Sequence, residues 1–416
     1  TNISAQSVPF SQGKWVKIAV SKQGFYQVTG TQLKSWGLTV PFTSTQLQLF
    51  NLNTANLVER VSANIGVGLN ENAIEVQDGG DGQFDNQDYF LFYSQGNIQW
   101  KWNGSLQLFE HSKNVHGDSV YYFISLGKDG KRIQKLNSNY VANTTTDIFD
   151  ERWVMEKDTI NILNSGQIWW GPAMGLGIGK QSKINTSLNM EGLMNPSDLI
   201  FKLNYAAATT TSAANFELTL NDQKLRTTIV APISGYIYDD AANVVMDTFR
   251  IPLSNNLIST NLATANLGVG YVSANTNSTG WINYITLQAK RKIGFYGGAK
   301  SVAFRNTSLV GNGKVIQYQI KDADASTKIW EVTQPENPVE MVNNFQNGVA
   351  SFIQRADTLR EFFGVNKSGY ETPSLVEVLN IDYPSLLNTP AADYIIITAS
   401  NYLKAEDSLA KFHAVN

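Results

Sequence analysis

Short runs of alternating apolar and polar residues are the feature that most restricts how this chain can fold. Clear examples are KWVKIAV at 14–20, FELTL at 216–220 and ITLQA at 285–289. Because successive side chains of a strand point to opposite faces, this pattern predicts β-strands with one buried face. The turn residues Asn221-Asp222, directly after the second run, fit a tight hairpin. The sequence therefore predicts a mainly β protein.

The length of the chain predicts several domains. With 416 residues and a mass of 46.0 kDa, it is too long for one ordinary hydrophobic core. The strand and turn signals predict an N-terminal β-rich domain at 1–141 and a β-sandwich or jelly roll at 142–325. A short β connector is expected at 326–390, and residues 391–416 are expected to begin an α/β domain.

Two local patterns in the first domain predict specific elements. The run YFLFY at 89–93 is too apolar for an exposed strand. A short helix is expected to open at Thr29 or Thr31, whose side chains can accept a hydrogen bond from a free backbone N–H, and to close at Gly37.

Three further patterns predict turns and pairings. Asp129-Gly130 is typical of the tight turn of a β-hairpin. The segment DTINILNSG at 158–166 predicts a short helix. The runs 349–355 and 359–363 are expected to be strands that pair with each other.

The last 24 residues have the pattern of a strand, a turn and a helix. The unbroken apolar run 394–397 is typical of a strand covered on both faces, and Ser400 or Asn401 can cap the helix that follows. A βα unit needs a second parallel strand, so we expect a new domain to begin here, and the apolar stripe of its helix to pack on the β domains or stand partly exposed. That stripe consists of Tyr402, Ala405, Leu409 and Phe412.

Composition excludes several classes of function. The net charge is -3, so no basic field is available to bind nucleic acid. No apolar run approaches the roughly 20 residues that span a bilayer. The cysteine count is 0, which excludes disulfides, thiolate metal sites and a cysteine nucleophile within these residues.

An acidic loop is the strongest local candidate for a metal site. Its four aspartates lie within eleven residues, and neighbouring glycines allow a tight backbone, as in calcium loops. The spacing does not match the EF-hand pattern, so an alternative is a turn in which the carboxylates cap backbone N–H groups. The candidate calcium ligands are Asp78, Asp81, Asp85 and Asp88.

Tryptophan pairs and histidines are the other candidate site residues. Trp169 and Trp170, with Trp100 and Trp102, can form a stacking platform for a sugar or peptide, or fill a core or domain junction. The sequence has no G-x-S-x-G motif that would support a serine triad with one of the three histidines. His111 and His116 are therefore expected to be surface or capping residues. The run KRK at 290–292 is expected to be a solvated strand end.

Seven segments, taken in order, resemble one known family. They are GKWVKIAVSKQGFYQVT at 13–29, DGQFDNQDYFLFY at 81–93, VYYFISLGKDGKRI at 120–133, EKDTINILNSGQIWWG at 156–171, IWEVT at 329–333, DYIIIT at 393–398 and SLAKFH at 408–413. In this order they resemble the PorU-type sortases of the type IX secretion system, which are gingipain-like cysteine peptidases of Bacteroidetes surfaces.

The resemblance implies a secreted endopeptidase, associated with the outer membrane at the cell surface. Such an enzyme removes the C-terminal sorting domain of cargo proteins and joins the new end to an anionic lipopolysaccharide. The implied partners are that cargo and other outer-membrane components of type IX secretion. The family's catalytic histidine and cysteine belong to a caspase- and gingipain-like α/β domain, and both are expected after Asn416. His413 does not occupy the position of the catalytic histidine.

Three hypotheses follow. The first is that the chain is the non-catalytic N-terminal region of such a peptidase, a scaffold for the α/β domain and a surface for cargo. The second is a stand-alone surface β-sandwich that binds carbohydrate or protein. The third is a hydrolase without a cysteine nucleophile, complete within these residues, and it has the least support.

Overall fold

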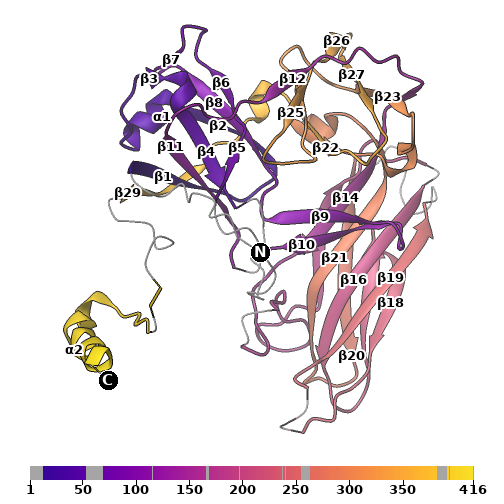
Figure 1. Cartoon of the computed structure of the whole chain (residues 1–416). Coiled ribbons are helices and arrows are strands. Elements are labelled where there is room, and N and C mark those ends of the chain that lie inside the picture. Colours follow the sequence, from indigo (N-terminus) through magenta and orange to yellow (C-terminus); the bar gives the residue numbers. More distant parts are fainter. Residues whose placement is uncertain are drawn as a thin grey trace.

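The computed structural model describes residues 13–52, 69–114, 116–164, 168–195, 197–236, 238, 240–253, 263–381, 391–392 and 394–415. Across these ranges the protein is mainly β, as predicted. Three β-rich units lie next to one another, and a two-stranded hairpin lies between them (Figure 1). The helix α2 (Leu403–Val415), near the C-terminus, lies apart from the three units (Figure 1).

The first unit consists of three small sheets around one core. A five-stranded sheet has the order β29-β1-β11-β4-β5, a three-stranded sheet has the order β2-β8-β6, and β3 pairs with β7. The strands are β1 (Gly13–Val20), β2 (Gly24–Thr29), β3 (Phe42–Thr43), β4 (Leu47–Asn51), β5 (Asn70–Asn72), β6 (Glu75–Gln77), β7 (Gln83–Phe84), β8 (Tyr89–Ser94), β11 (Val120–Leu126) and β29 (Ser374–Ile381).

The helix predicted in this unit is present as α1 (Gly30–Ser35). Thr29 is its N-cap and forms a reciprocal capping box with Gln32. The Thr29 hydroxyl accepts from the Gln32 N–H at 3.2 Å, and the Gln32 side chain accepts from the Thr29 N–H at 2.8 Å. Gly37 follows the helix with a φ of +88°, which a residue with a Cβ rarely adopts.

Strand β8 is buried on both faces, as its sequence predicts. Phe90 and Phe92 face the core of the first unit, whereas Leu91 and Tyr93 belong to a second cluster with residues of the third unit. In that cluster the ring of Phe25 lies 3.9 Å from the ring of Trp330. This aromatic contact joins the first unit to the third.

The second unit is a β-sandwich. One sheet has the order β14-β21-β16-β19 and the other β15-β20-β17-β18. The strands are β14 (Ile148–Glu156), β15 (Lys183–Asn189), β16 (Asp198–Ala208), β17 (Ala214–Leu220), β18 (Gln223–Val230), β19 (Asn243–Pro252), β20 (Thr264–Ser273) and β21 (Thr279–Lys292).

The predicted alternation positions the core of this sandwich. In β17, Phe216, Leu218 and Leu220 are buried, and the residues between them are partly exposed. Asn221 and Asp222 both have positive φ angles, of 50° and 62°, and close the β17–β18 hairpin as predicted.

The third unit also contains two sheets, with the orders β12-β25-β24-β28-β22 and β13-β23-β27-β26. Its core contains residues on both sides of position 325, where one domain was expected to end. The strands are β12 (Gln134–Leu136), β13 (Thr144–Thr146), β22 (Ser301–Phe304), β23 (Val315–Ile320), β24 (Lys328–Glu331), β25 (Val339–Met341), β26 (Asn344–Gln346), β27 (Val349–Arg355) and β28 (Phe362–Val365).

Two predicted pairings are wrong. β27 pairs with β23 and β26, whereas β28 pairs with β22 and β24, so the two strands lie in different sheets of one core. Asp129-Gly130 does not close a hairpin, because β12 pairs in parallel with β25 of the third unit instead of returning along β11. A Cβ at Gly130 would lie 2.1 Å from the Leu47 carbonyl oxygen, so this glycine permits a close backbone approach.

The helix expected at 158–166 is absent from 158–164, and its last two residues lie outside the described ranges. Ile160 forms a β-bridge to Trp170, and a turn follows at 161–164. The Trp170 N–H donates to the Ile160 carbonyl at 2.7 Å, and the Ile160 N–H donates to the Trp170 carbonyl at 2.9 Å. Backbone hydrogen bonds between Ile160 and Trp170 therefore take the place of helical hydrogen bonds.

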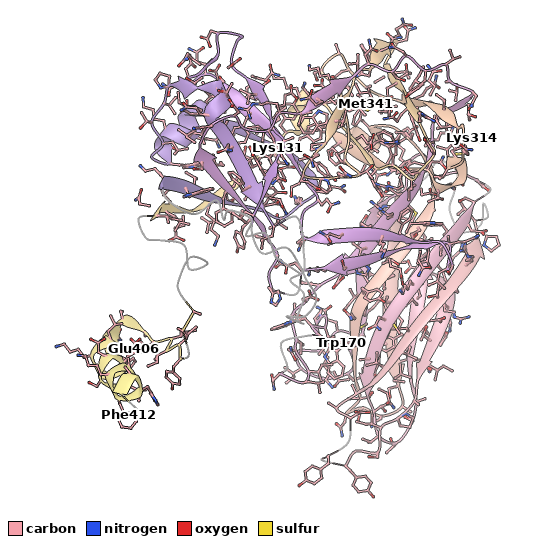
Figure 2. The ribbon with its side chains drawn as sticks, in the orientation of Figure 1. Lys131, Trp170, Lys314, Met341, Glu406 and Phe412 are labelled. Atoms are coloured by element: carbon pink, nitrogen blue, oxygen red, sulfur yellow. The ribbon has the colours of Figure 1, made fainter. Side chains whose placement is uncertain are left out.

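The C-terminal prediction is correct for the helix and wrong for the strand. Residues 394–397 are not a strand, since they pair with no described strand and Ile397 is 95% exposed. Neither Ser400 nor Asn401 is the N-cap, because a 3-10 turn at Ser400–Tyr402 precedes α2. The apolar stripe stands exposed, one of the two expected outcomes, and Phe412 shows 61% of its surface (Figure 2).

Candidate functional site

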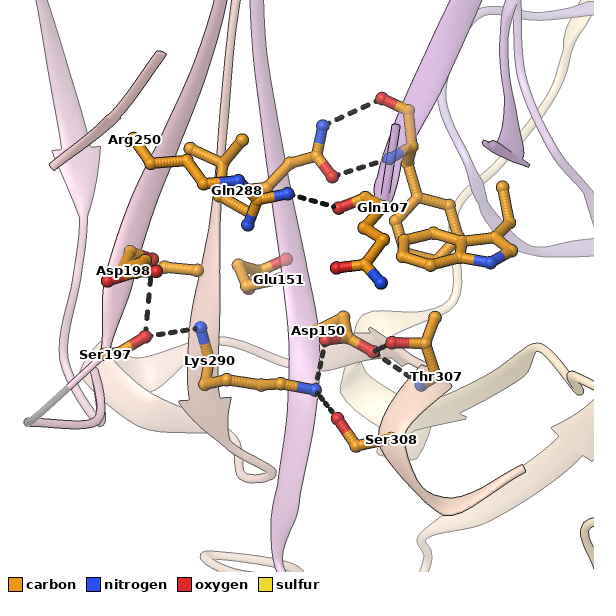
Figure 3. Close-up of a pocket in the computed structure, with 14 residues that line it drawn as sticks. Gln107, Asp150, Glu151, Ser197, Asp198, Arg250, Gln288, Lys290, Thr307 and Ser308 are labelled. Carbon is orange, nitrogen blue, oxygen red and sulfur yellow. Dashed lines mark hydrogen bonds and ion pairs between the residues drawn. The ribbon is translucent and has the colours of Figure 1, made fainter. Parts of the chain in front are cut away.

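The hairpin of β9 (Ile98–Asn103) and β10 (Leu108–Lys113) crosses the outer face of the β14-β21-β16-β19 sheet (Figure 1). The side-chain amide of Gln288, on β21, holds Phe109, near the start of β10, by two hydrogen bonds. The Gln288 oxygen accepts from the Phe109 N–H at 2.7 Å, and its nitrogen donates to the Phe109 carbonyl at 2.8 Å (Figure 3). A side chain thus takes the place of a neighbouring strand.

Side-chain hydrogen bonds and an ion pair hold the rest of the hairpin against the sandwich. His111 Nε2 lies 2.6 Å from a carboxylate oxygen of Glu156, and both side chains are at least 90% buried. The prediction of a surface or capping role for His111 is therefore wrong. Lys113 donates to Asp158 at 2.8 Å, and Arg250 donates to two carbonyl groups at the hairpin tip at 3.2 and 3.0 Å.

A buried charge cluster lies beside the hairpin, where the sandwich meets the third unit. Arg152 donates to both carboxylate oxygens of Glu361, at 2.9 and 3.1 Å, and Arg305 Nε donates to the same carboxylate at 2.8 Å. The Arg152 guanidinium also lies over the rings of Trp100 and Phe109, at 5.2 and 4.8 Å from their centroids. Three side chains, two cationic and one anionic, therefore share one site.

The pKa values in this cluster follow from burial and charge. Burial would raise the pKa of Glu361, but the two guanidiniums outweigh it and hold that pKa below the usual 4.5. Burial, with repulsion from Arg305, lowers the pKa of Arg152 to about 10, and Glu361 opposes this shift. With two guanidiniums and one carboxylate, the cluster has one more cationic than anionic side chain.

Two cavities flank the hairpin, and Trp102 and Phe109 line both. The first, which we name the β9 cleft, has a volume of about 240 Å³ and lies between β9 and parts of the first and third units. The second, the sandwich pocket, has a volume of about 430 Å³ and lies between the hairpin tip and the sandwich (Figure 3).

Polar groups of the sandwich pocket are largely paired with one another. Lys290 forms an ion pair with Asp150 and donates to Ser308 at 2.7 Å (Figure 3). The Thr307 N–H and hydroxyl donate to Asp150 at 2.7 and 3.0 Å. Lys290 is thus part of a pocket wall, and the neighbouring Arg291, 11% exposed, pairs with Glu151 at 2.6 Å. The predicted solvated strand end is therefore wrong.

The predicted calcium residues stabilise their own loop. Each carboxylate accepts a hydrogen bond from a nearby backbone N–H: Asp78 from Gly80 at 3.0 Å, Asp81 from Gln83 at 2.8 Å, Asp85 from Gln87 at 2.7 Å and Asp88 from Asp85 at 2.6 Å. No three His, Cys, Asp or Glu side chains in the described part of the chain gather to hold a metal ion. The geometry favours the capping role.

The four tryptophans predicted as a platform do not lie together. Trp170 is 6% exposed and lies beside the sandwich (Figure 2), with its backbone paired to Ile160. Trp169 is 37% exposed. Trp100 and Trp102 instead lie on β9, where they contact His111 and Phe109, with ring centroids 5.4 and 4.9 Å apart. The hairpin pair therefore lines the cavities.

The residues that build this site were missed from the sequence because their contacts are distant along the chain. Gln288 binds Phe109 across 179 positions, and Arg152 binds Glu361 across 209. The nearest signal was the W-x-W pattern of Trp100 and Trp102, with Lys101 between them. Among the described helices, none is long and apolar enough to cross a membrane.

Comparison with solved structures identifies the fold. A crystal structure of dimeric latent PorU from Porphyromonas gingivalis superposes with a TM-score of 0.72 over 90% of this chain, at 18% sequence identity. The chain has a PorU-like fold. It corresponds to 34% of the length of that PorU chain. No protein-family model and no curated protein matches the sequence.

Two carbohydrate-binding modules match about a third of this PorU-like chain. A CBM36 carbohydrate-binding module in complex with calcium and xylotriose covers 33% of the chain at 10% identity, with a TM-score of 0.21. A CBM36-1 domain of a xylanase from the hindgut metagenome of Trinervitermes trinervoides covers 33% at 8% identity, also with a TM-score of 0.21. TM-scores this low support no argument about function.

Proposed function

We propose that this chain is the non-catalytic N-terminal region of a secreted sortase-type cysteine endopeptidase. In this proposal the complete enzyme cleaves C-terminal sorting domains from type IX secretion cargo at the cell surface, associated with the outer membrane. The superposition on PorU over 90% of the chain is the observation that carries the proposal. Because the 416 residues contain no cysteine, a cysteine nucleophile in this proposal has to come from another part of the enzyme.

The role that follows for this region is to hold the peptidase domain and to present a surface to cargo. Three units joined by buried aromatic and ionic contacts provide a rigid support. The exposed stripe of α2 supplies an apolar face for a following domain, because an amphipathic helix of this length is marginal in water without a partner.

The proposal is tested by comparing the complete product of the gene with this chain. Both are incubated with a cargo protein that carries a C-terminal sorting domain, and cleavage is followed by mass spectrometry. We expect the complete product to cleave the cargo and this chain to leave it intact. Cleavage by the 416-residue chain, or an intact cargo with the complete product, would refute the proposal. Surface labelling of intact cells checks the location.

A glycan-binding surface module is the second candidate. The sandwich pocket favours it, because Trp102 and Phe109 form an aromatic wall beside polar side chains such as Gln107 and Asp198. A glycan array with this chain and with Trp102→Ala is the test. Glycan binding that the Trp102→Ala variant loses supports this function, and an array without signal rejects it. Trp169→Ala, at a residue that does not line the pocket, serves as the matched control.

A further inference from the structure

Strand β9 has one paired and one unpaired edge. Among the described strands it pairs with β10 alone. Its other edge therefore presents a row of backbone N–H and C=O groups that pair with none of the described strands. Such an edge is a template for a further strand, and proteins commonly cover it or blunt it.

The register shows which groups point outward. The Asn114 N–H donates to the Asn97 carbonyl at 2.9 Å, which makes these two residues a hydrogen-bonded pair. Hydrogen-bonded and non-hydrogen-bonded pairs alternate along an antiparallel ladder. The N–H and C=O groups of Ile98, Trp100 and Trp102 therefore point away from β10.

Phe109 confirms this assignment on the opposite strand. It lies opposite Trp102, so its N–H and C=O should point away from β9. These are the two groups that Gln288 binds. On β10, the side chain of Gln288 therefore binds the outward backbone groups at Phe109 in place of a strand. Among the described residues, no side chain binds the outward groups of β9 in this way.

The unpaired edge borders a cavity. Five consecutive residues of β9, at 98–102, line the β9 cleft. A cavity on the face of a strand would be lined by alternate residues, because their side chains alternate, so consecutive lining places the cleft along the edge. Val332, Thr333, Leu359 and Glu361 lie on its other side. The cleft has a volume of about 240 Å³.

The charge of the cleft selects among extended chains. The charged side chains that line it are Lys101, Arg152 and Glu361. Glu361 is shared by Arg152 and by Arg305, whose side chain is 1% exposed and whose Nη2 has no hydrogen-bond partner among the described residues. Lys101 is exposed, whereas the buried group of Arg152, Arg305 and Glu361 has one more cation than anion in a place where water screens little. This surplus complements a carboxylate.

We propose that the β9 cleft binds an extended peptide segment that carries a carboxylate. The segment adds as a strand to the outer edge of β9, bonded to the N–H and C=O groups of Ile98, Trp100 and Trp102, with its carboxylate toward Arg152. A peptide matches the two-residue repeat of these groups, roughly 6.6–6.8 Å, which a sugar chain does not. The proposed site rests on this geometry alone. That the bound segment belongs to a cargo protein is a further step, which rests on the proposed function.

The probe is a synthetic seven-residue peptide of alternating threonine and valine with a glutamate at its centre, titrated into the intact chain and followed by NMR shifts of the β9 amides. A series with one N-methyl group moved along the peptide tests strand addition. We expect N-methylation at alternate positions, whose N–H faces β9, to weaken binding roughly tenfold, and methylation at the others to have little effect. Replacing the glutamate by glutamine should also weaken binding about tenfold.

A protein variant gives an independent test. Ile98→Pro removes an N–H that points away from β10, so the hairpin is retained and the outer edge is blocked. Ile98→Val is the matched control and should bind as the unaltered chain does. No binding at millimolar peptide, or binding indifferent to the position of the N-methyl group, overturns the proposal. Self-association of the chain through this edge, detected by size, also overturns it. These outcomes leave cargo cleavage by the complete product untouched, so the two proposals fail separately.

Discussion

The double hydrogen bond of Gln288 to Phe109 should be the main anchor of the β9–β10 hairpin, and Gln288→Ala tests it. Both residues are buried, at 5% and 2% exposure. The substitution leaves the Phe109 N–H and C=O without partners, and each unpaired buried group costs about 1–3 kcal/mol. Because Gln288 also borders the open sandwich pocket, water can form some of the lost hydrogen bonds to Phe109. We therefore expect the hairpin to lose about 2 kcal/mol of local stability.

Hydrogen exchange measures this loss where it occurs. A local destabilisation of about 2 kcal/mol speeds exchange of the protected hairpin amides roughly 30-fold. Lys101 and Glu110 supply suitable probes, because they form a pair that the register places among the hydrogen-bonded ones. Gln346→Ala, at an exposed position of β26, is the control and should leave these rates unchanged. Equal exchange in the two variants would refute the anchoring role of Gln288.

A second substitution at the same position separates hydrogen bonding from packing. In Gln288→Glu, the ionised carboxylate accepts from the Phe109 N–H but repels the Phe109 carbonyl, whereas the protonated form can bond to both. Burial and this carbonyl should raise the folded pKa of the new side chain above its unfolded value of about 4.3. The loss of hairpin stability relative to the unaltered chain should then be small below about pH 4.3, the unfolded pKa, and grow as the pH rises through the folded pKa. A deficit independent of pH would indicate packing instead.

Three further predictions concern other parts of the fold. Glu361→Gln leaves Arg152 and Arg305 without a carboxylate and should cost about 3 kcal/mol in urea unfolding. Since the folded pKa of Glu361 lies below 4.5, its stabilisation is present above that value and is lost as the pH falls through the folded pKa. The difference in unfolding free energy between the unaltered chain and the variant should therefore become smaller in acid. Thr29→Ala removes the capping box of α1 and should cost about 1 kcal/mol, and no change in the urea midpoint would contradict the capping role. Replacing Leu409 and Phe412 together by serine should leave the unfolding of the β units unchanged and lower the binding of a hydrophobic dye, whereas a destabilised β core would show that α2 packs on it.

Local patterns predicted the elements of this fold better than their pairing. The alternation in β17, the turn at Asn221-Asp222 and the capping box at Thr29 depend on neighbouring residues, and all three are present. Asp129-Gly130 also has a local turn signal, but the chain crosses there to the third unit, and tertiary pairing with β25 decides the outcome. Turn chemistry shows where a chain can reverse, and the available partner strand determines whether it does.

The candidate site was outside the reach of sequence patterns for a related reason. A glutamine that replaces a strand and an arginine shared between a carboxylate and two aromatic rings have no characteristic spacing. The acidic loop had the opposite property, a dense local motif whose carboxylates bind their own backbone. Residues distant in the chain become neighbours only through packing, so composition and spacing do not reveal them.

The buried charge cluster explains why the β9 cleft keeps its form. A buried ion pair is weak support for stability, because apolar residues of similar volume often serve as well. A bidentate guanidinium and carboxylate, however, fix both distance and orientation. Arg152 comes from the sandwich and Glu361 directly precedes β28, so their two hydrogen bonds hold the walls of the cleft at a set separation. The second guanidinium, Arg305, then leaves the positive surplus that an apolar contact would not provide. One cluster thus supplies both the spacing and the charge of the cleft.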